Sequence, residues 1–97
     1  MKRFRLLHDA LLEVLEAFRY YRSQAPNLGA TFIQEVKAAI LDVAENPEQW
    51  AVFRPPVRRR LVHRFPYAVL YKIEQDEVVV VAVMHMHRNP TYWVGRT

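Results

Sequence analysis

The segment from Val78 to Val83 places apolar, mostly β-branched side chains on both faces of an extended chain, which restricts the folds open to this sequence. A strand that is apolar on both faces has to be covered on both. We therefore expect residues 77–87 to form a central strand, covered by helices on one face and partly covered on the other. Residues 67–74 have the same strand composition and join this strand through the turn dipeptide Gln75-Asp76.

Two amphipathic patterns precede these strands and predict helices. Between Asp9 and Gln24, apolar residues recur at helical spacing and charged residues take the other side. The apolar stripe consists of Leu11, Val14, Leu15, Phe18 and Tyr21, and the charged side consists of Glu13, Glu16, Arg19 and Arg22. Pro26 and Gly29 interrupt this pattern, and a second stripe then runs up to Asn46-Pro47. Its residues are Leu28, Phe32, Val36, Ile40 and Val43. Two helices joined by so short a turn form an antiparallel hairpin that packs its apolar stripes on a common partner.

The remaining segments complete an α+β fold. Residues 2–7 predict a short first strand, residues 57–64 predict a further strand, and residues 48–56 predict an irregular crossing loop. We therefore expect a two-helix antiparallel hairpin packed on a mainly antiparallel sheet, with a short N-terminal strand and a C-terminal three-strand meander. A chain of 97 residues has room for only one hydrophobic core, so residues 1–97 are expected to form a single domain.

The sequence lacks several residue types and motifs, and their absence excludes some classes of protein function. The chain has no cysteine, so neither a disulfide nor a thiolate zinc site can form, and a reducing compartment is expected. No apolar run approaches the roughly 20 residues of a membrane span, and acidic residues interrupt any signal-peptide core near the start. No glycine-rich phosphate loop and no nucleophile elbow occurs, which sets nucleotide cofactors and serine-type hydrolysis aside. These features predict a cytoplasmic protein with no cofactor and no membrane partner.

Basic charge is concentrated in the second half of the chain. Residues 1–49 contain six Lys or Arg and seven Asp or Glu, whereas residues 50–97 contain eight and three. Alternation along the predicted strand places Arg58, Arg60 and Arg64 on one face. Three aligned guanidinium groups repel one another and need an anionic partner, either nucleic acid or an acidic protein surface. The alternative is a set of solvated charges that keeps an edge strand from aggregating.

The last predicted strand ends in a cluster of candidate catalytic groups. His85 and His87 share a face if the strand continues through them, and Arg88 follows. One alternative is general acid–base chemistry in RNA cleavage, with Arg88 stabilising the transition state. A second is a metal site with His63, but no carboxylate or cysteine lies nearby in the sequence, so we expect no metal. A third, which we favour, is hydrogen bonding of the histidines within a packed strand end.

Aromatic residues lie among and beyond the arginines. Tyr67, Tyr71, Tyr92 and Trp93 could stack on unpaired bases of a nucleic acid. We expect Tyr67 and Tyr71 to pack in the core instead. Tyr92 and Trp93 lie in a short tail with Arg96, where exposure and contact with a partner are expected.

An ordered set of motifs along nearly the whole chain resembles a known family. After the short first strand come Tyr20-Tyr21, Pro26-Asn27-Leu28-Gly29, Phe32, Asn46-Pro47, the run Arg64-Phe65-Pro66-Tyr67-Ala68-Val69-Leu70-Tyr71, and the ending His85, Arg88, Pro90, Tyr92 and Trp93. Together they resemble the RelE/ParE superfamily of toxins from type II toxin–antitoxin (plasmid stabilisation) systems, and in particular its ParE-like branch.

The resemblance implies a growth-inhibiting toxin held inactive by a cognate antitoxin in a hetero-oligomer. ParE-like members inhibit DNA gyrase, whereas RelE-like members are endoribonucleases that cut mRNA on the ribosome. In the nuclease alternative, Arg60 or Arg64 would correspond to the arginine that RelE-like nucleases have on a strand of the sheet. Arg88 would correspond to their arginine later in the chain. The terminal proton-transfer group would then be His85, His87 or Tyr92. No lysine pair stands beside the arginines and Tyr92 lies after Pro90, which favours gyrase binding over enzymatic activity.

The resemblance also implies which residues meet a partner. We expect acidic residues of the antitoxin to cover the arginines, and we expect the partner-binding set to be Arg58, Arg60, Arg64, Arg88, Tyr92 and Trp93. A third alternative is an interaction module that binds the antitoxin but has lost toxicity.

Overall fold

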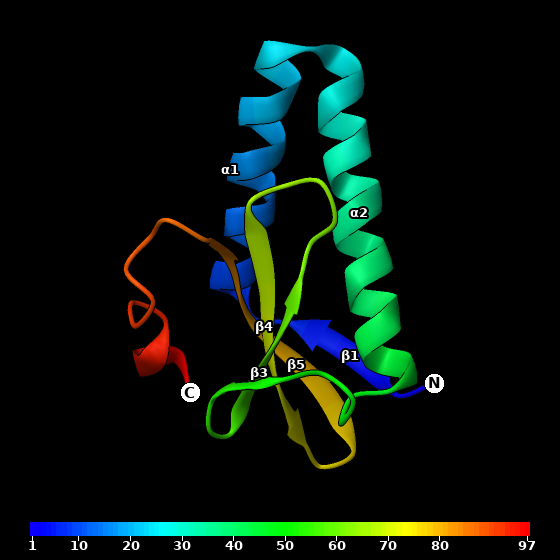
Figure 1. The fold of residues 1–97 in the computed structure, drawn as a ribbon, viewed down its shortest axis with the longest axis vertical. Coiled ribbons are helices and arrows are strands. Elements are labelled where there is room, and N and C mark those ends of the chain that lie inside the picture. Colours follow the sequence, from blue (N-terminus) through cyan, green and yellow to red (C-terminus); the bar gives the residue numbers. More distant parts are fainter.

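The two helical patterns form a long hairpin in the computed structural model, which describes all 97 residues (Figure 1). Helix α1 spans His8–Gln24 and helix α2 spans Pro26–Glu45, so that only Ala25 separates them. Pro26 suits the first turn of α2, where its missing N–H is not needed. The helices approach closely near this turn, since a Cβ on Gly29 would lie 3.0 Å from the Cβ of Arg22.

The hairpin packs on a five-stranded sheet with the order β1-β5-β4-β3-β2. The strands are β1 (Arg3–Leu6), β2 (Val52–Arg54), β3 (Val57–Leu61), β4 (Tyr67–Glu74) and β5 (Glu77–His85). Strand β1 runs parallel to β5, and all other neighbours are antiparallel. Gln75 and Asp76 both have positive φ, at 50° and 64°, as a two-residue hairpin turn requires. The α+β architecture predicted from the sequence is therefore confirmed, including the helical hairpin and the C-terminal meander.

Three predicted segment boundaries are corrected. The loop at residues 48–56 contains strand β2, which pairs with β3 and forms one edge of the sheet. The strand predicted over residues 57–64 ends at Leu61, because the chain turns there and Arg64 takes a φ of 71°. The last strand ends at His85 instead of residue 87.

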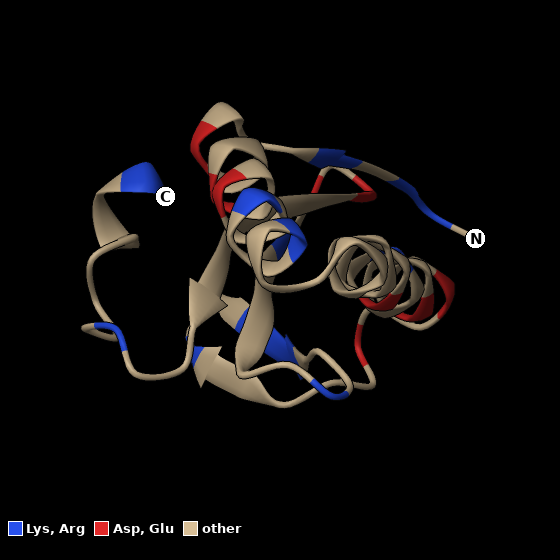
Figure 2. Cartoon of the chain, turned by 90° about the horizontal axis from the view of Figure 1, so that it is seen from above, with Lys and Arg blue, Asp and Glu red and all other residues tan.

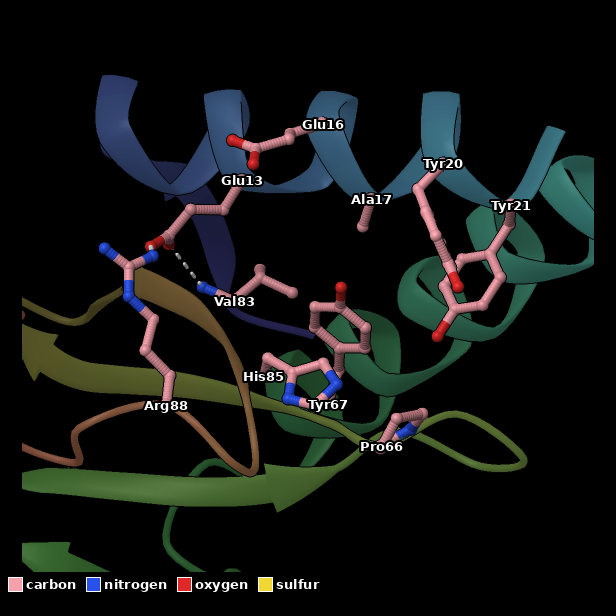
Figure 3. Close-up of a pocket in the computed structure, with 10 residues that line it drawn as sticks. All are labelled: Glu13, Glu16, Ala17, Tyr20, Tyr21, Pro66, Tyr67, Val83, His85 and Arg88. Carbon is pink, nitrogen blue, oxygen red and sulfur yellow. Dashed lines mark hydrogen bonds and ion pairs between the residues drawn. The ribbon is translucent and has the colours of Figure 1, made fainter. Parts of the chain in front are cut away.

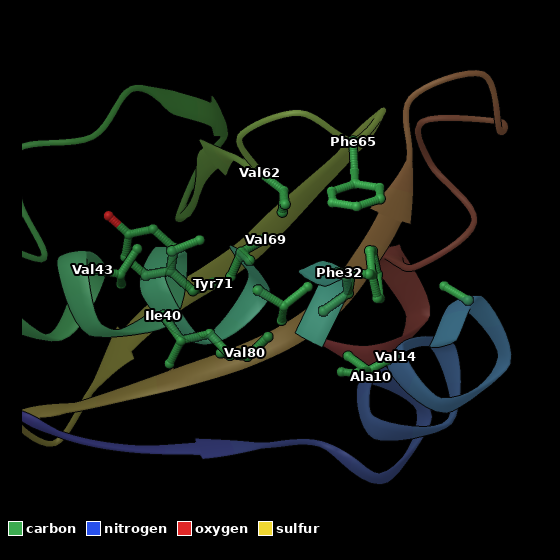
Figure 4. Close-up of a cluster of buried hydrophobic side chains, with 14 of the residues drawn as sticks. Ala10, Val14, Phe32, Ile40, Val43, Val62, Phe65, Val69, Tyr71 and Val80 are labelled. Atoms are coloured by element: carbon green, nitrogen blue, oxygen red, sulfur yellow. The ribbon is translucent and has the colours of Figure 1, made fainter. Parts of the chain in front are cut away.

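The main core lies between the hairpin and the sheet (Figure 4). Phe32, Val36, Ile40 and Val43 of α2 are buried there, as the predicted stripe requires. Aromatic rings close the end of this core near the helix–helix turn, where the ring centroid of Phe32 lies 5.2 Å from those of Tyr21, Phe65 and Tyr67.

Helix α1 buries a different stripe from the predicted one. Its buried residues are Ala10, Val14 and Ala17, whereas Leu11 and Leu15 are 45% and 38% exposed. Small side chains on the buried face let the helix lie close to the sheet, and this rotates the two leucines outward. Val14, Phe18 and Tyr21 remain in contact with the core as predicted.

A second core cluster covers the opposite face of the sheet. Trp93 lies at its centre with 1% exposure, and its indole centroid is 6.2 Å from the ring of Phe53. The C-terminal segment after β5 turns back beside the sheet (Figure 1), and its residues Tyr92, Trp93 and Val94 pack in this cluster. The predicted exposure of Trp93 is therefore wrong, because the indole fills the apolar face of β4 and β5 that the helices leave uncovered. Strand β5 is covered on both faces, as its composition predicts.

The basic residues of the second half do not form one face. Figure 2 shows basic positions on the N-terminal strand, the sheet, the C-terminal segment and the helical hairpin, and acidic positions mainly on the helices. Arg58 and Arg60 point toward the helical side, whereas Arg59 lies over the ring of Phe53 on the other side of the sheet. Neither helix is long and apolar enough to cross a membrane.

Tyr71 provides a prediction about alkaline stability. The residue is fully buried, its hydroxyl donates to the carbonyl oxygen of Pro47, and burial raises its pKa to about 12. Burial likewise raises the pKa of Tyr67 to about 12. Below pH 10 both phenols are protonated in the folded and the unfolded chain, but between pH 10 and 12 only the unfolded chain releases these protons. The free energy of unfolding should therefore fall over this range, by about 1.4 kcal/mol per pH unit for each phenol.

Urea denaturation at a series of pH values checks this expectation. Tyr71→Phe removes one of the two phenols and should make the decline between pH 10 and 12 shallower, whereas its stability at neutral pH drops by about 1 kcal/mol for the lost hydrogen bond. A wild-type stability that stays constant up to pH 12 would contradict the raised pKa of both phenols.

Candidate functional site: a groove between helix α1 and the end of strand β5

A groove of about 580 Å³ lies between α1 and the ends of β4 and β5 (Figure 3). Its lining residues are Glu13, Glu16, Ala17, Tyr20 and Tyr21 of α1, Pro66 and Tyr67 at the start of β4, and Val83, His85 and Arg88 at the end of β5. Two of the predicted nuclease residues, His85 and Arg88, are therefore in it. The others, Arg60, Arg64, His87 and Tyr92, do not line it.

Glu13 is the polar centre at one end of the groove. Its side chain is 11% exposed, and its Oε1 accepts hydrogen bonds from the backbone N–H of Val83 and from Nη1 of Arg96, both at 3.0 Å. Its Oε2 accepts from the hydroxyl of Tyr92 and from Nη2 of Arg96 at 3.2 Å. Arg88 lies further away, with Nη1 3.5 Å from the same oxygen. One carboxylate thus joins α1, β5 and the C-terminal segment.

These contacts close the open edge of β5. Strand β1 pairs with β5 only as far as Val80, and Val81 has no partner on β4, where the register shifts. Side chains replace the missing strand beyond that point, because Arg96 donates to the carbonyl oxygen of Val81 at 3.1 Å and Glu13 accepts from the N–H of Val83. Unpaired backbone groups at a sheet edge would otherwise invite pairing with another chain.

Arg88 and Tyr92 are held in an internal stack. The guanidinium carbon of Arg88 lies 3.7 Å from the ring centroid of Tyr92, and that of Arg96 lies 5.1 Å from it. Burial raises the pKa of the Tyr92 phenol, and the hydrogen bond to Glu13 raises it further. A phenol with a raised pKa is a poor general base near neutral pH.

The hydrogen-bonding alternative holds for His85 alone, because β5 ends at His85 and the side chain of His87 is exposed. The Nδ1 of His85 accepts a hydrogen bond of 3.1 Å from the backbone N–H of His87, and the two rings are 5.2 Å apart. His85 also meets the ring of Tyr67 edge-on at 5.0 Å. His63 lies beside Glu35 of α2, and no three side chains of metal-binding type are grouped to hold an ion.

The predicted row of three arginines is not formed. Arg58 donates to the backbone carbonyl oxygens of Glu48 and Trp50, at 3.1 and 2.8 Å, and so fixes the loop before β2. Arg60 pairs with Asp42 of α2 at 2.7 Å and lies 4.9 Å from the ring centroid of Trp50. Arg64 lies in the turn after β3, because the strand ends before it. Arg58 and Arg60 have partners within the chain, and Arg64 is exposed.

A model of a known protein family matches residues 4–90. Its description is "ParE toxin of type II toxin-antitoxin system, parDE". The chain belongs to the ParE toxin family. The match includes both helices, four complete strands, β1 except Arg3, and every residue that lines the groove, and it ends before Tyr92 and Trp93.

Solved structures agree with this assignment at the level of the fold. A chain from the chromosomal ParDE toxin–antitoxin system of P. aeruginosa superposes on this ParE-family chain with a TM-score of 0.79. The two share 14% sequence identity, and the alignment covers 90% of this chain and 98% of the other. No curated protein matches the sequence significantly.

Sequence reasoning missed Glu13 and the groove of this ParE-family toxin. The sequence pattern puts Glu13 on the exposed side of α1, because it assigns Leu11 and Leu15 to the buried stripe. Ala10 and Ala17 contain the missed signal: Glu13 lies three residues after one and four before the other, so all three share a helix face. The groove also depends on Tyr21 and Tyr67, which meet only after the hairpin has folded onto the sheet.

Proposed function

We propose that this ParE-family toxin arrests growth by binding DNA gyrase, and that a cognate antitoxin neutralises it in a hetero-oligomer in the cytoplasm. The family match over residues 4–90 supports a toxin of a type II system. One observation favours protein binding over RNA cleavage: the candidate nuclease groups do not converge. Arg60 is paired with Asp42, Arg64 lies in a separate turn, and Tyr92 is bound to Glu13.

The charges that line the groove also favour protein binding over RNA cleavage. His85 and Arg88 are the two candidate nuclease residues that line it, and Glu13 and Glu16 lie beside them. The charge of Arg88 is already directed toward Glu13. An RNA phosphate would therefore meet two carboxylates, whereas phosphoryl-transfer sites place unpaired cations and donors where negative charge develops.

A gyrase supercoiling assay with the purified toxin tests the proposal. We expect supercoiling to fall as toxin is added in excess over gyrase, and to recover when the cognate antitoxin is mixed in first. A useful control is the same assay with a topoisomerase of a different class, which should be unaffected. Supercoiling that persists at every ratio, together with growth arrest that the antitoxin reverses, would rule out gyrase as the target.

The alternative of a ribosome-dependent mRNA endoribonuclease rests on His85 and Arg88 lying in one groove. If it held, transcripts would be cleaved soon after induction, and Arg64→Ala and Arg88→Ala would each reduce cleavage by about 10²–10³-fold. Arg54→Ala, at an exposed arginine on β2, is the matched control. Intact transcripts during growth arrest exclude this alternative, and harmless expression without antitoxin would leave only an interaction module.

A further inference from the structure

The groove beside α1 contains acidic and aromatic groups that the chain itself leaves without partners (Figure 3). Glu13 is saturated by its donors, but Glu16, one turn further along α1, forms no ion pair and is exposed. The one arginine of the lining, Arg88, is directed to Glu13 and stacked on Tyr92. Glu16 is therefore the one carboxylate of the lining that has no cationic partner.

Three tyrosines form the aromatic wall of the groove. The ring centroids of Tyr20 and Tyr21 are 5.2 Å apart, and those of Tyr21 and Tyr67 are 6.3 Å apart. The hydroxyls of Tyr71 and Tyr92 have partners elsewhere in the fold, whereas the three hydroxyls of the groove bond to no other protein group. Burial first, and then the neighbouring tyrosines and glutamates, hold the Tyr67 pKa at about 12. Burial disfavours charge of either sign, whereas the carboxylate of Glu16 beside these rings favours a positive one.

The rest of the molecule shows how this chain uses aromatic rings. The guanidinium groups of five arginines lie 3.7 to 5.2 Å from ring centroids, and these arginines are Arg22, Arg59, Arg60, Arg88 and Arg96. The rings of Tyr20, Tyr21 and Tyr67 have no such cation over them. Three of these arginines, Arg60, Arg88 and Arg96, also pair with a carboxylate, so the groove has the rings and the carboxylate of such sites but lacks the guanidinium.

We propose that the groove is a docking site for an arginine side chain presented by a partner protein, with the guanidinium against the tyrosine rings and paired with Glu16. A planar guanidinium suits this site better than an ammonium, because it stacks on rings and also bonds to a carboxylate through its fork of N–H donors. The unpaired carboxylate of Glu16 disfavours a phosphate or an acidic side chain at the same place. The inference concerns how a partner is held and does not depend on which enzyme the toxin inhibits.

The test uses ¹⁵N-labelled toxin and the probe N-acetyl-arginine methylamide, followed by NMR titration. We expect saturable shifts confined to the groove residues on α1 and at the end of β5. The citrulline analogue, which has the same shape without the charge, should cause little change. Glu16→Gln should weaken binding about two- to fivefold, the effect of one partly exposed ion pair. Glu45→Gln, at an exposed acid on α2, is the matched control and should bind as the wild type does.

Four outcomes would overturn the proposal. They are equal binding of the citrulline analogue, equal binding of a lysine analogue, saturable shifts that lie elsewhere on the protein, and no saturable shift at all. A groove that pairs two copies of the chain would also overturn it, and would show as shifts that depend on protein concentration without the probe. A gyrase assay on the same sample keeps this result separate from the proposed function, because the probe can bind whether or not supercoiling is inhibited.

Discussion

Trp93→Ala is expected to lower the free energy of unfolding by about 3–5 kcal/mol, the usual cost of removing a large buried aromatic side chain. The indole is 1% exposed and forms the centre of the cluster on the face of the sheet opposite the helices. A single domain has only about 5–15 kcal/mol of net stability, so this one change removes a large share of it. Urea denaturation followed by far-ultraviolet circular dichroism is the suitable measurement, since fluorescence would lose one of the two tryptophans.

Two further variants make this expectation specific. The Nε1 of Trp93 has no hydrogen-bond partner, so Trp93→Phe gives up volume but no hydrogen bond and should cost less than the alanine variant. Leu12→Ala removes a large apolar side chain that is 47% exposed on α1, and should change stability by only about 0.5 kcal/mol. Equal losses for Trp93→Ala and Leu12→Ala would show that the C-terminal segment is not part of the core.

Glu13→Ala is expected to cost a similar amount, about 3–5 kcal/mol, because it leaves buried cationic and polar partners without an acceptor. The lost contacts are those to the N–H of Val83, the hydroxyl of Tyr92 and the guanidinium of Arg96. Glu13→Gln retains one acceptor oxygen and should be less severe. Denaturation of Glu13→Ala, Arg96→Ala and the double variant measures the coupling directly, and we expect about 1–3 kcal/mol.

The ionisation of Tyr92 distinguishes the hydrogen-bonding role of Glu13 from a role in packing alone. Glu13 raises the pKa of Tyr92 through their hydrogen bond, in addition to the effect of burial. In Glu13→Gln the Tyr92 phenol should therefore ionise at lower pH than in the wild type, as ultraviolet absorbance of tyrosinate reports. Glu45→Gln, at an exposed acid of α2, is the control that should leave stability and this titration unchanged. Equal effects of the two glutamate variants would contradict the central position of Glu13.

Periodicity predicted the architecture because each regular element had to bury a continuous face. The α2 stripe from Phe32 to Val43 and the apolar run of β5 left few arrangements, and both lie where the patterns require. The buried face of helix α1 was harder to predict, because the helix contains more apolar residues than one face can bury. Its two small residues, Ala10 and Ala17, mark the true contact face, and Leu11 and Leu15 turn outward.

The candidate site was harder to predict because it is built from irregular segments. Residues 86–97 follow no strand or long-helix pattern, so nothing local indicated that Trp93 returns to cover the sheet. The alignment of Arg58, Arg60 and Arg64 assumed a strand that continues past Leu61, and a single turn removes it. Partners far apart in sequence, such as Arg60 with Asp42, then decide which charges remain free.

The parallel pairing of β1 with β5 has a consequence for how the chain folds. Arg3 is in register with Glu77, so the strand made first has no partner until most of the chain exists. Contacts of such long sequence separation require a large loop to close before they stabilise anything, and proteins rich in them fold slowly. A truncated product that ends before residue 77 would lack both the last strand and the groove, so neither the full sheet nor the groove forms until β5 has been made.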